Sequence, residues 1–180
     1  LYELTLIGQG RYHEITSLST VNTFLGVSSL LRALVKSKHG LQCSFCRGTG
    51  IQDDGLDCAL CHGSGINADF YDSRISTGPT IREIITSPVS QILKYLPADA
   101  EPVQRLHFLD RMGAGYLTLA RAVRTLSTGE FQRLHLASKA GVINTSKHQI
   151  LLFDEPSRGL SQNYLNNLCR ILRDLIAKKN

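Results

Sequence analysis

Four of the five cysteines form two Cys-x-x-Cys pairs, Cys43 with Cys46 and Cys58 with Cys61. Structural zinc sites use four ligands in a tetrahedron, and two such pairs deliver four thiolates to one point. Two glycines follow each pair and let the backbone fold back without side-chain clashes. The spacing therefore predicts a structural zinc site with these four cysteines as ligands, a closed shell that leaves no place for a catalytic water.

Other interpretations of the cysteines stay open. The pairs could form a metal-free reduced loop or a redox pair, and His62 could compete as a ligand, although it is expected to face solvent or phosphate. The doubled Cys-x-x-Cys-x-Gly-x-Gly unit also resembles the cysteine-rich region of DnaJ-type chaperones, a resemblance that predicts nothing about residues 126–160. The fifth cysteine, Cys169, is expected in the apolar core.

A helix start that suits an anion lies in the segment Leu-Ser-Thr-Gly-Glu at residues 126–130. Ser127 and Glu130 have the spacing of a capping box. A helix that begins here directs free backbone N–H groups and the positive end of its dipole outward, and phosphate is the usual ligand of such an end. Gly129 keeps the approach open, although most capping boxes are only caps.

An acidic pair follows a short apolar run. The continuous apolar run at residues 150–153 predicts a buried strand, as in a parallel sheet. Asp154 and Glu155 follow at the carboxyl end of this strand, where α/β proteins bind ligands. Asp154 can hold Mg²⁺ through water, and Glu155 can orient an attacking water or accept its proton. The alternative is a solvated strand end.

The elements around these motifs are predicted from apolar spacing and capping residues. Residues 1–24 are expected to be irregular, and a helix is expected from Val27 to near His39. Thr80 and Glu83 form a second candidate capping box.

Further helices are predicted towards the carboxyl end. Ser87 is expected to cap a helix with Pro88 in its first turn, another helix should end at residues 113–115, and a third should begin at Ser127. The apolar face of the second is predicted at Val103, Leu106, Leu109 and Met112. The apolar face of the last helix is predicted at Leu165, Leu168, Cys169, Leu172, Leu175 and Ile176. A strand followed by a helix is typical of an α/β unit.

The order of these motifs resembles the UvrA family of ABC-type ATPases over nearly the whole chain. Residues 126–137, Leu-Ser-Thr-Gly-Glu-Phe-Gln-Arg-Leu-His-Leu-Ala, resemble the UvrA form of the ABC signature, and residues 152–160, Leu-Phe-Asp-Glu-Pro-Ser-Arg-Gly-Leu, resemble its Walker B and following loop. Residues 112–119 are similar to the family's approach to the signature. The family also has zinc modules, and Gln9 with residues 19–23 resembles its Q-loop region.

The resemblance implies an α/β fold class: part of an ABC-type ATPase half, with a mostly helical signature domain and an inserted four-cysteine zinc module. It implies zinc and ATP with Mg as cofactors. Ser127, Gly129 and Glu130 would belong to the nucleotide site, the first two contacting a γ-phosphate bound mainly by a partner half. Gln9, Asp154 and Glu155 would serve the nucleotide of their own half, with Glu155 catalytic.

The resemblance also implies a role and partners. The role is recognition of damaged double-stranded DNA in nucleotide excision repair, within the SOS response. The partners are a second ATPase half or a UvrA homodimer, and a UvrB-like protein. The implied domains are a Q-loop segment with its lead-in helix (1–40), the zinc module (41–66), a helical signature domain (67–125), and the signature helix with Walker B and the following helix (126–180).

The sequence departs from the family pattern in several places. No Gly-x-x-x-x-Gly-Lys-Ser/Thr occurs, and the chain stops before the family's switch histidine, so the chain alone is not expected to hydrolyse ATP. Thr128 stands where the family has a glycine, residues 157–158 replace a threonine pair, and the link between Cys46 and Cys58 is short. These departures favour a fragment, or alternatively a non-hydrolysing remnant that docks on an intact ATPase.

Bulk properties narrow the partners further. A formal net charge of +5 favours an anionic partner such as nucleic acid, although many proteins reach it with a solvated surface. No stretch is apolar and long enough to span a bilayer, and the amino-terminal residues lack the pattern of a signal peptide. A cytoplasmic protein without a membrane partner is therefore expected.

Overall fold

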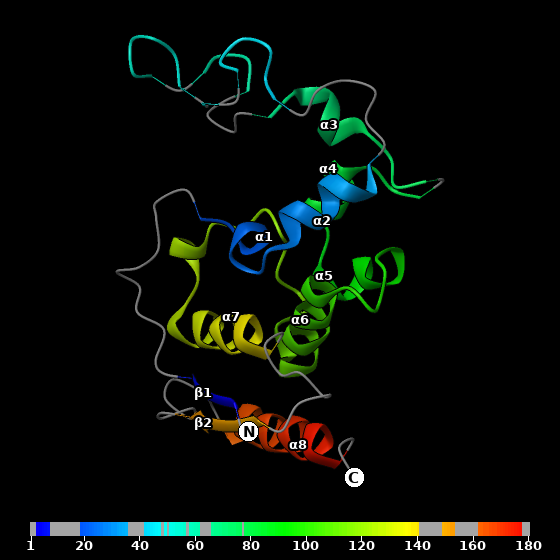
Figure 1. The fold of residues 1–180 in the computed structure, drawn as a ribbon, viewed down its shortest axis with the longest axis vertical. Coiled ribbons are helices and arrows are strands. Elements are labelled where there is room, and N and C mark those ends of the chain that lie inside the picture. Colours follow the sequence, from blue (N-terminus) through cyan, green and yellow to red (C-terminus); the bar gives the residue numbers. More distant parts are fainter. Residues whose placement is uncertain are drawn as a thin grey trace. The chain divides into compact units, whose positions relative to one another are not determined.

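The computed structural model divides into two compact units, residues 1–27 with 87–180 and residues 28–86, which are described separately (Figure 1). The residues that it describes are 3–7, 19–35, 42–47, 49, 51–56, 58–61, 66–76, 78–140, 149–153 and 162–177. The predictions made for Gln9, His62, Asp154 and Glu155 lie outside these residues.

The first unit contains a parallel pair of strands, β1 (Glu3–Ile7) and β2 (Gln149–Phe153), with Glu3 opposite Gln149 and Ile7 opposite Phe153. The strand expected at residues 150–153 is confirmed. The expectation that residues 1–24 are irregular is wrong for Glu3–Ile7, which form β1, and for Val21–Phe24, which form the helix α1. Residues 1–2 and 8–18 of this range lie outside the described residues.

The expectation that β2 is buried is also wrong for two of its side chains. Ile150 and Leu152 are about half exposed. Side chains two residues apart point to the same face of a strand, so one face of β2 is open to solvent. Only two strands pair among the described residues, and they leave this face uncovered.

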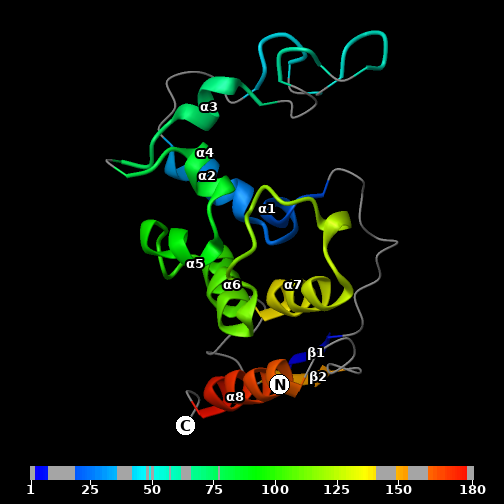
Figure 2. The ribbon, with the colours of Figure 1, turned by 180° about the vertical axis from the view of Figure 1, so that it is seen from behind.

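Packed helices form the core of the first unit. α6 (Glu101–Leu109) continues into the π-helical turn η3 (Asp110–Ala114), and it packs against α7 (Thr128–Ala140), as Figures 1 and 2 show from opposite sides. The predicted apolar face is confirmed, since its four members are fully buried: Val103, Leu106, Leu109 and Met112. Gly113 has φ of 75°, a left-handed conformation that favours glycine and that accompanies the end of this helical run.

Shorter elements join these helices. They are α1 (Val21–Phe24), α5 (Val89–Ile92), η2 (Leu93–Tyr95) and η4 (Val123–Thr125). The prediction that Ser87 caps a helix is wrong, because Pro88 occupies the cap position of α5 without a side-chain hydrogen bond. Pro88 instead forms an antiparallel bridge with Thr118, which holds it in an extended conformation outside the helix.

The last helix of the first unit is α8 (Gln162–Ala177). Leu168 of the predicted apolar face is buried, together with Ile171 one turn later. The prediction that Cys169 belongs to the core is wrong, because its side chain is exposed. It directly follows Leu168, and neighbouring positions on a helix point about 100° apart, so only one of the two faces the core.

The second unit contains α2 (Val27–Leu34), α3 (Ala68–Asp72) and α4 (Ile81–Thr86). The capping box predicted before α4 is confirmed: the Thr80 backbone N–H donates to Glu83 at 2.7 Å, and the Glu83 N–H donates to the Thr80 hydroxyl oxygen at 3.1 Å. α2 begins as expected but ends at Leu34, earlier than predicted. No helix among the described residues has the length and apolar character needed to cross a membrane.

Candidate metal centre and signature helix

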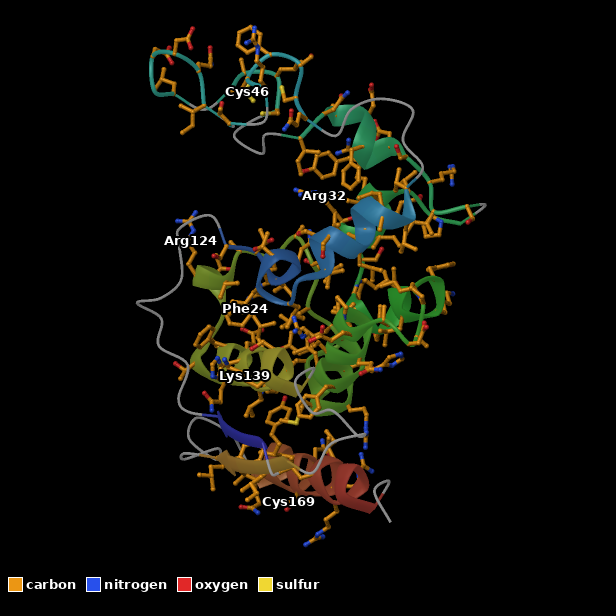
Figure 3. All side chains as sticks on the ribbon, in the orientation of Figure 1. Phe24, Arg32, Cys46, Arg124, Lys139 and Cys169 are labelled. Atoms are coloured by element: carbon orange, nitrogen blue, oxygen red, sulfur yellow. The ribbon has the colours of Figure 1, made fainter. Side chains whose placement is uncertain are left out.

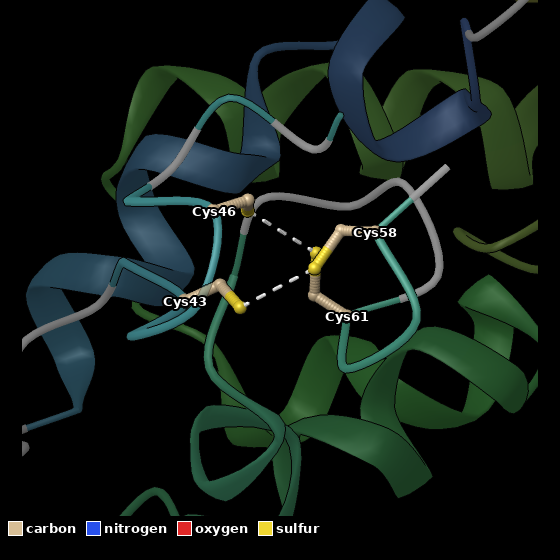
Figure 4. A group of neighbouring side chains, drawn as sticks. All are labelled: Cys43, Cys46, Cys58 and Cys61. Atoms are coloured by element: carbon tan, nitrogen blue, oxygen red, sulfur yellow. Dashed lines mark hydrogen bonds between the residues drawn. The ribbon is translucent and has the colours of Figure 1, made fainter. Parts of the chain in front are cut away.

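The four paired cysteines converge on one point (Figure 4). The sulfurs of Cys43 and Cys58 are 3.9 Å apart, those of Cys46 and Cys61 are 3.6 Å apart, and all four lie within 4.8 Å of one another. Four sulfurs bound to zinc at about 2.3 Å in a tetrahedron would be separated by about 3.8 Å. The separations of 3.9 and 3.6 Å are far longer than the roughly 2.05 Å of a disulfide. The geometry fits a four-coordinate metal site.

Local turns bring the sulfurs together. Cys46 begins a turn that Thr49 closes: the backbone N–H and hydroxyl of Thr49 both donate to the Cys46 carbonyl, at 3.1 and 2.9 Å. Arg47 takes a left-handed φ of 53°, which reverses the chain directly after the first pair. An antiparallel bridge between Gln42 and Ile66 then closes the base of the module.

The sulfurs themselves are the interior of this module. All four cysteines are buried, and the buried cluster that they form contains no other described residue. Buried thiolates need a compensating charge, and a zinc ion would supply it. A site with four thiolates has no open coordination position, so the chemistry that it supports is structural. Folding of the module is then coupled to metal binding.

The second predicted site lies at the start of α7. The Ser127 backbone N–H and hydroxyl donate to one carboxylate oxygen of Glu130 at 2.8 and 2.9 Å, and the Glu130 N–H donates to the Ser127 hydroxyl oxygen at 3.3 Å. The predicted capping box is therefore confirmed. Ser127 and Thr128 are exposed and Gly129 is half-buried. The Ser127 N–H already donates to the Glu130 carboxylate, and an external anion at this helix start stays a prediction.

Glu130 is buried and holds several groups together. The Tyr116 hydroxyl donates to its other oxygen at 2.8 Å, and Arg121 lies 3.6 Å from the oxygen that binds Ser127. Burial opposes ionisation, but the hydrogen bonds from Ser127 and Tyr116 and the charge of Arg121 outweigh it, so the pKa of Glu130 falls below its ordinary value. The described contacts of Glu130 are internal, and its role in nucleotide binding stays a prediction.

Sequence reasoning missed the groups behind Glu130. Arg133 donates to the Tyr116 hydroxyl at 3.3 Å, and its guanidinium carbon lies 4.1 Å from the ring centre of Tyr164 on α8. This cation–π contact joins the signature helix to the helix that follows β2. No local pattern reveals it, because Arg133 and Tyr164 are far apart in the sequence.

Comparison with known proteins places the chain. No family model matches it. UvrABC system protein A of Bacillus subtilis (strain 168) is 44% identical over 75 residues, which cover 42% of the chain and 8% of that protein. UvrABC system protein A of Streptococcus pyogenes serotype M3 is 30% identical over 169 residues, which cover 92% of the chain and 16% of that protein. The chain belongs to the UvrA family.

The fold agrees with membership of the UvrA family. The crystal structure of UvrA2 from Deinococcus radiodurans matches with a TM-score of 0.67 and 24% identity, over 99% of the chain and 25% of that protein. At this identity the likeness concerns the fold, an arrangement of helices with a small sheet that fits part of an ABC ATPase. The chain spans less than a fifth of the length of these two curated relatives, 8% and 16%.

Replacing one predicted metal ligand tests the metal site. In Cys58→Ser, a thiolate is lost from the shell, so the purified chain should retain far less than stoichiometric zinc, and residues 42–61 should lose protection against amide exchange. The matched control is Cys169→Ser, which changes the exposed cysteine of α8 and should keep full zinc. Zinc is measured by elemental analysis. Stoichiometric zinc in Cys58→Ser would contradict the assignment of the four ligands.

The lowered pKa of Glu130 predicts a pH-dependent contribution to folding. The ionised carboxylate stabilises the folded chain above the ordinary pKa of 4.5, and this contribution is lost as the pH falls through the lower pKa of the folded state. Glu130→Gln should reduce the free energy of unfolding by about 2 kcal/mol at neutral pH. The difference from wild type should narrow in acid.

Urea unfolding at a series of pH values measures this effect. Glu101→Gln serves as the control, because Glu101 is an exposed glutamate in the same unit, in an ion pair with Arg105. It should change the free energy of unfolding far less. A constant difference between wild type and Glu130→Gln at all pH values would contradict the electrostatic role of the carboxylate.

Proposed function

We propose that the chain is part of a UvrA-like ATP- and DNA-binding subunit that recognises damaged DNA in nucleotide excision repair. The observation that supports this most is the capped signature helix α7, which precedes β2 in a chain similar to UvrA proteins over 92% of its length. The DnaJ-type interpretation explains only the cysteine pairs and has no counterpart for this arrangement. A cytoplasmic location is part of the proposal.

The nucleotide role rests on position within the signature. The N–H groups at the start of α7, around Ser127 and Gly129, would contact the γ-phosphate of an ATP that a second ATPase half or another UvrA molecule holds. In its own half, Asp154 would hold Mg²⁺ through water and Glu155 would act on the attacking water. A UvrB-like protein would then receive the recognised DNA.

The charge distribution supports a DNA partner for the first unit. The first unit contains fourteen basic and nine acidic residues, a formal net charge of +5, whereas the second unit contains six of each. The entire net charge of the chain therefore belongs to the first unit. Basic residues attract phosphates whatever the base sequence. A protein that recognises DNA by its deformation needs contacts of this kind.

Binding to a duplex that carries a bulky adduct tests the DNA role. Fluorescence anisotropy over a series of salt concentrations should show affinity falling linearly with salt on logarithmic axes. Arg124→Gln, on η4 of the first unit, should reduce the slope by about one. The matched control is Arg32→Gln in the second unit, which should leave the slope unchanged; both arginines are exposed, and Figure 3 labels them. A flat response to salt would contradict the proposal.

Removing the two caps separately tests the nucleotide role. Ser127→Ala and Thr80→Ala each delete a capping side chain and should cost about 1 kcal/mol of stability. Only Ser127 stands in the signature, so only Ser127→Ala should weaken association of the chain with an intact UvrA protein in the presence of Mg²⁺ and a non-hydrolysable ATP analogue. Equal association of Ser127→Ala and wild type, measured by sedimentation, would contradict the role of the signature.

A further inference from the structure

Several large apolar side chains of the cysteine module are exposed. Phe45, Ile51, Leu56 and Leu60 are exposed by 63, 53, 65 and 54%. These four, called here the module patch, are half of the eight large apolar side chains that are exposed among the described residues, and they fall within sixteen residues. Scattered exposed apolar residues are ordinary, whereas a local concentration marks an interaction surface.

The module patch is not needed for the module's own core. The interior consists of the four cysteines, and a metal held there stabilises the fold without apolar packing. In a segment this short, apolar side chains could otherwise cover the interior, but here they extend into solvent. The folding of the module therefore does not explain why these apolar side chains are exposed.

The segment that carries the module patch also has a cavity and a net negative charge. Phe45 and Ile51 share the lining of a cavity of about 730 Å³ with two exposed carboxylates and one exposed guanidinium: Asp53, Asp54 and Arg47. Residues 42–61 contain one basic residue and three acidic residues, a formal net charge of −2. Zinc held by four thiolates would add roughly two more negative charges. The module is thus opposite in sign to the first unit and unsuited to a phosphate backbone.

We propose that the module patch docks a protein segment whose large apolar side chains alternate with lysine or arginine. The apolar side chains would cover Ile51, Leu56 and their neighbours, and the basic groups would pair with Asp53 and Asp54. This inference goes beyond the proposed function, because it holds whether or not the first unit binds DNA or nucleotide. It assigns the cysteine module to protein contact and DNA attraction to the other unit.

A fluorescent synthetic peptide of alternating leucine and lysine serves as the probe, with the zinc-loaded chain as the titrant. Ile51→Ser with Leu56→Ser removes apolar contact, and Asp53→Asn with Asp54→Asn removes charge. Each pair should weaken binding at least about fivefold. Asparagine keeps the side-chain oxygen that accepts the Leu56 N–H at 3.0 Å from Asp54, so this loop retains its turn. Stoichiometric zinc in each variant confirms that the module remains folded.

Two controls distinguish binding at the module patch from a general attraction between the peptide and the chain. Tyr95→Ser with Asp99→Asn removes an exposed ring and a nearby exposed carboxylate from the first unit, and it should bind the probe like wild type. A peptide with glutamate in place of lysine should bind far more weakly. The proposal is overturned if the module variants bind the probe like wild type. It is also overturned if Ile51→Ser with Leu56→Ser abolishes self-association of the chain, which would make a second copy the occupant.

Discussion

A buried carboxylate organises the first unit. Glu130 carries its negative charge at the start of α7, where the helix dipole and free backbone N–H groups favour an anion. Burial of a charge is costly, and the donors from Ser127 and Tyr116 offset that cost. Because Tyr116 precedes the signature and is also held by Arg133, one side chain fixes both the cap of α7 and the segment that leads to it.

The second unit is organised by a different interaction. In the cysteine module the buried cluster is four cysteines, whose sulfurs lie close enough together to hold a metal ion. The two parts also differ in charge. The first unit carries the net positive charge of the chain, whereas the module leaves Phe45 and Leu56 exposed in a segment with a net negative charge. The two units therefore present surfaces suited to different partners.

Local signals in the sequence predicted most of the candidate sites. Both capping boxes and the cysteine cluster depend on residues a few positions apart, or on a spacing repeated within one segment, and the structure confirms their geometry. Features that depend on distant partners were missed or wrong. Strand β1 pairs with β2 across nearly the whole chain, and Pro88 is held by Thr118 rather than by a serine cap. Apolar spacing placed both Cys169 and Leu168 on one face, and tertiary packing decides that only Leu168 is buried.

The stack of Arg133 on Tyr164 has a consequence for how this sequence can vary. A side chain at Gly113 would have its first carbon 3.0 Å from the ring of Tyr164, so the ring occupies space that only glycine leaves free. The size of residue 113 and the presence of an aromatic ring at 164 are therefore not independent. In a relative with a larger residue at the first position, the ring at the second would have to shift by a few tenths of an ångström, and its stacking on Arg133 would shift with it. Substitution at the turn around Gly113 is thus limited by α8, a helix that begins about fifty residues later.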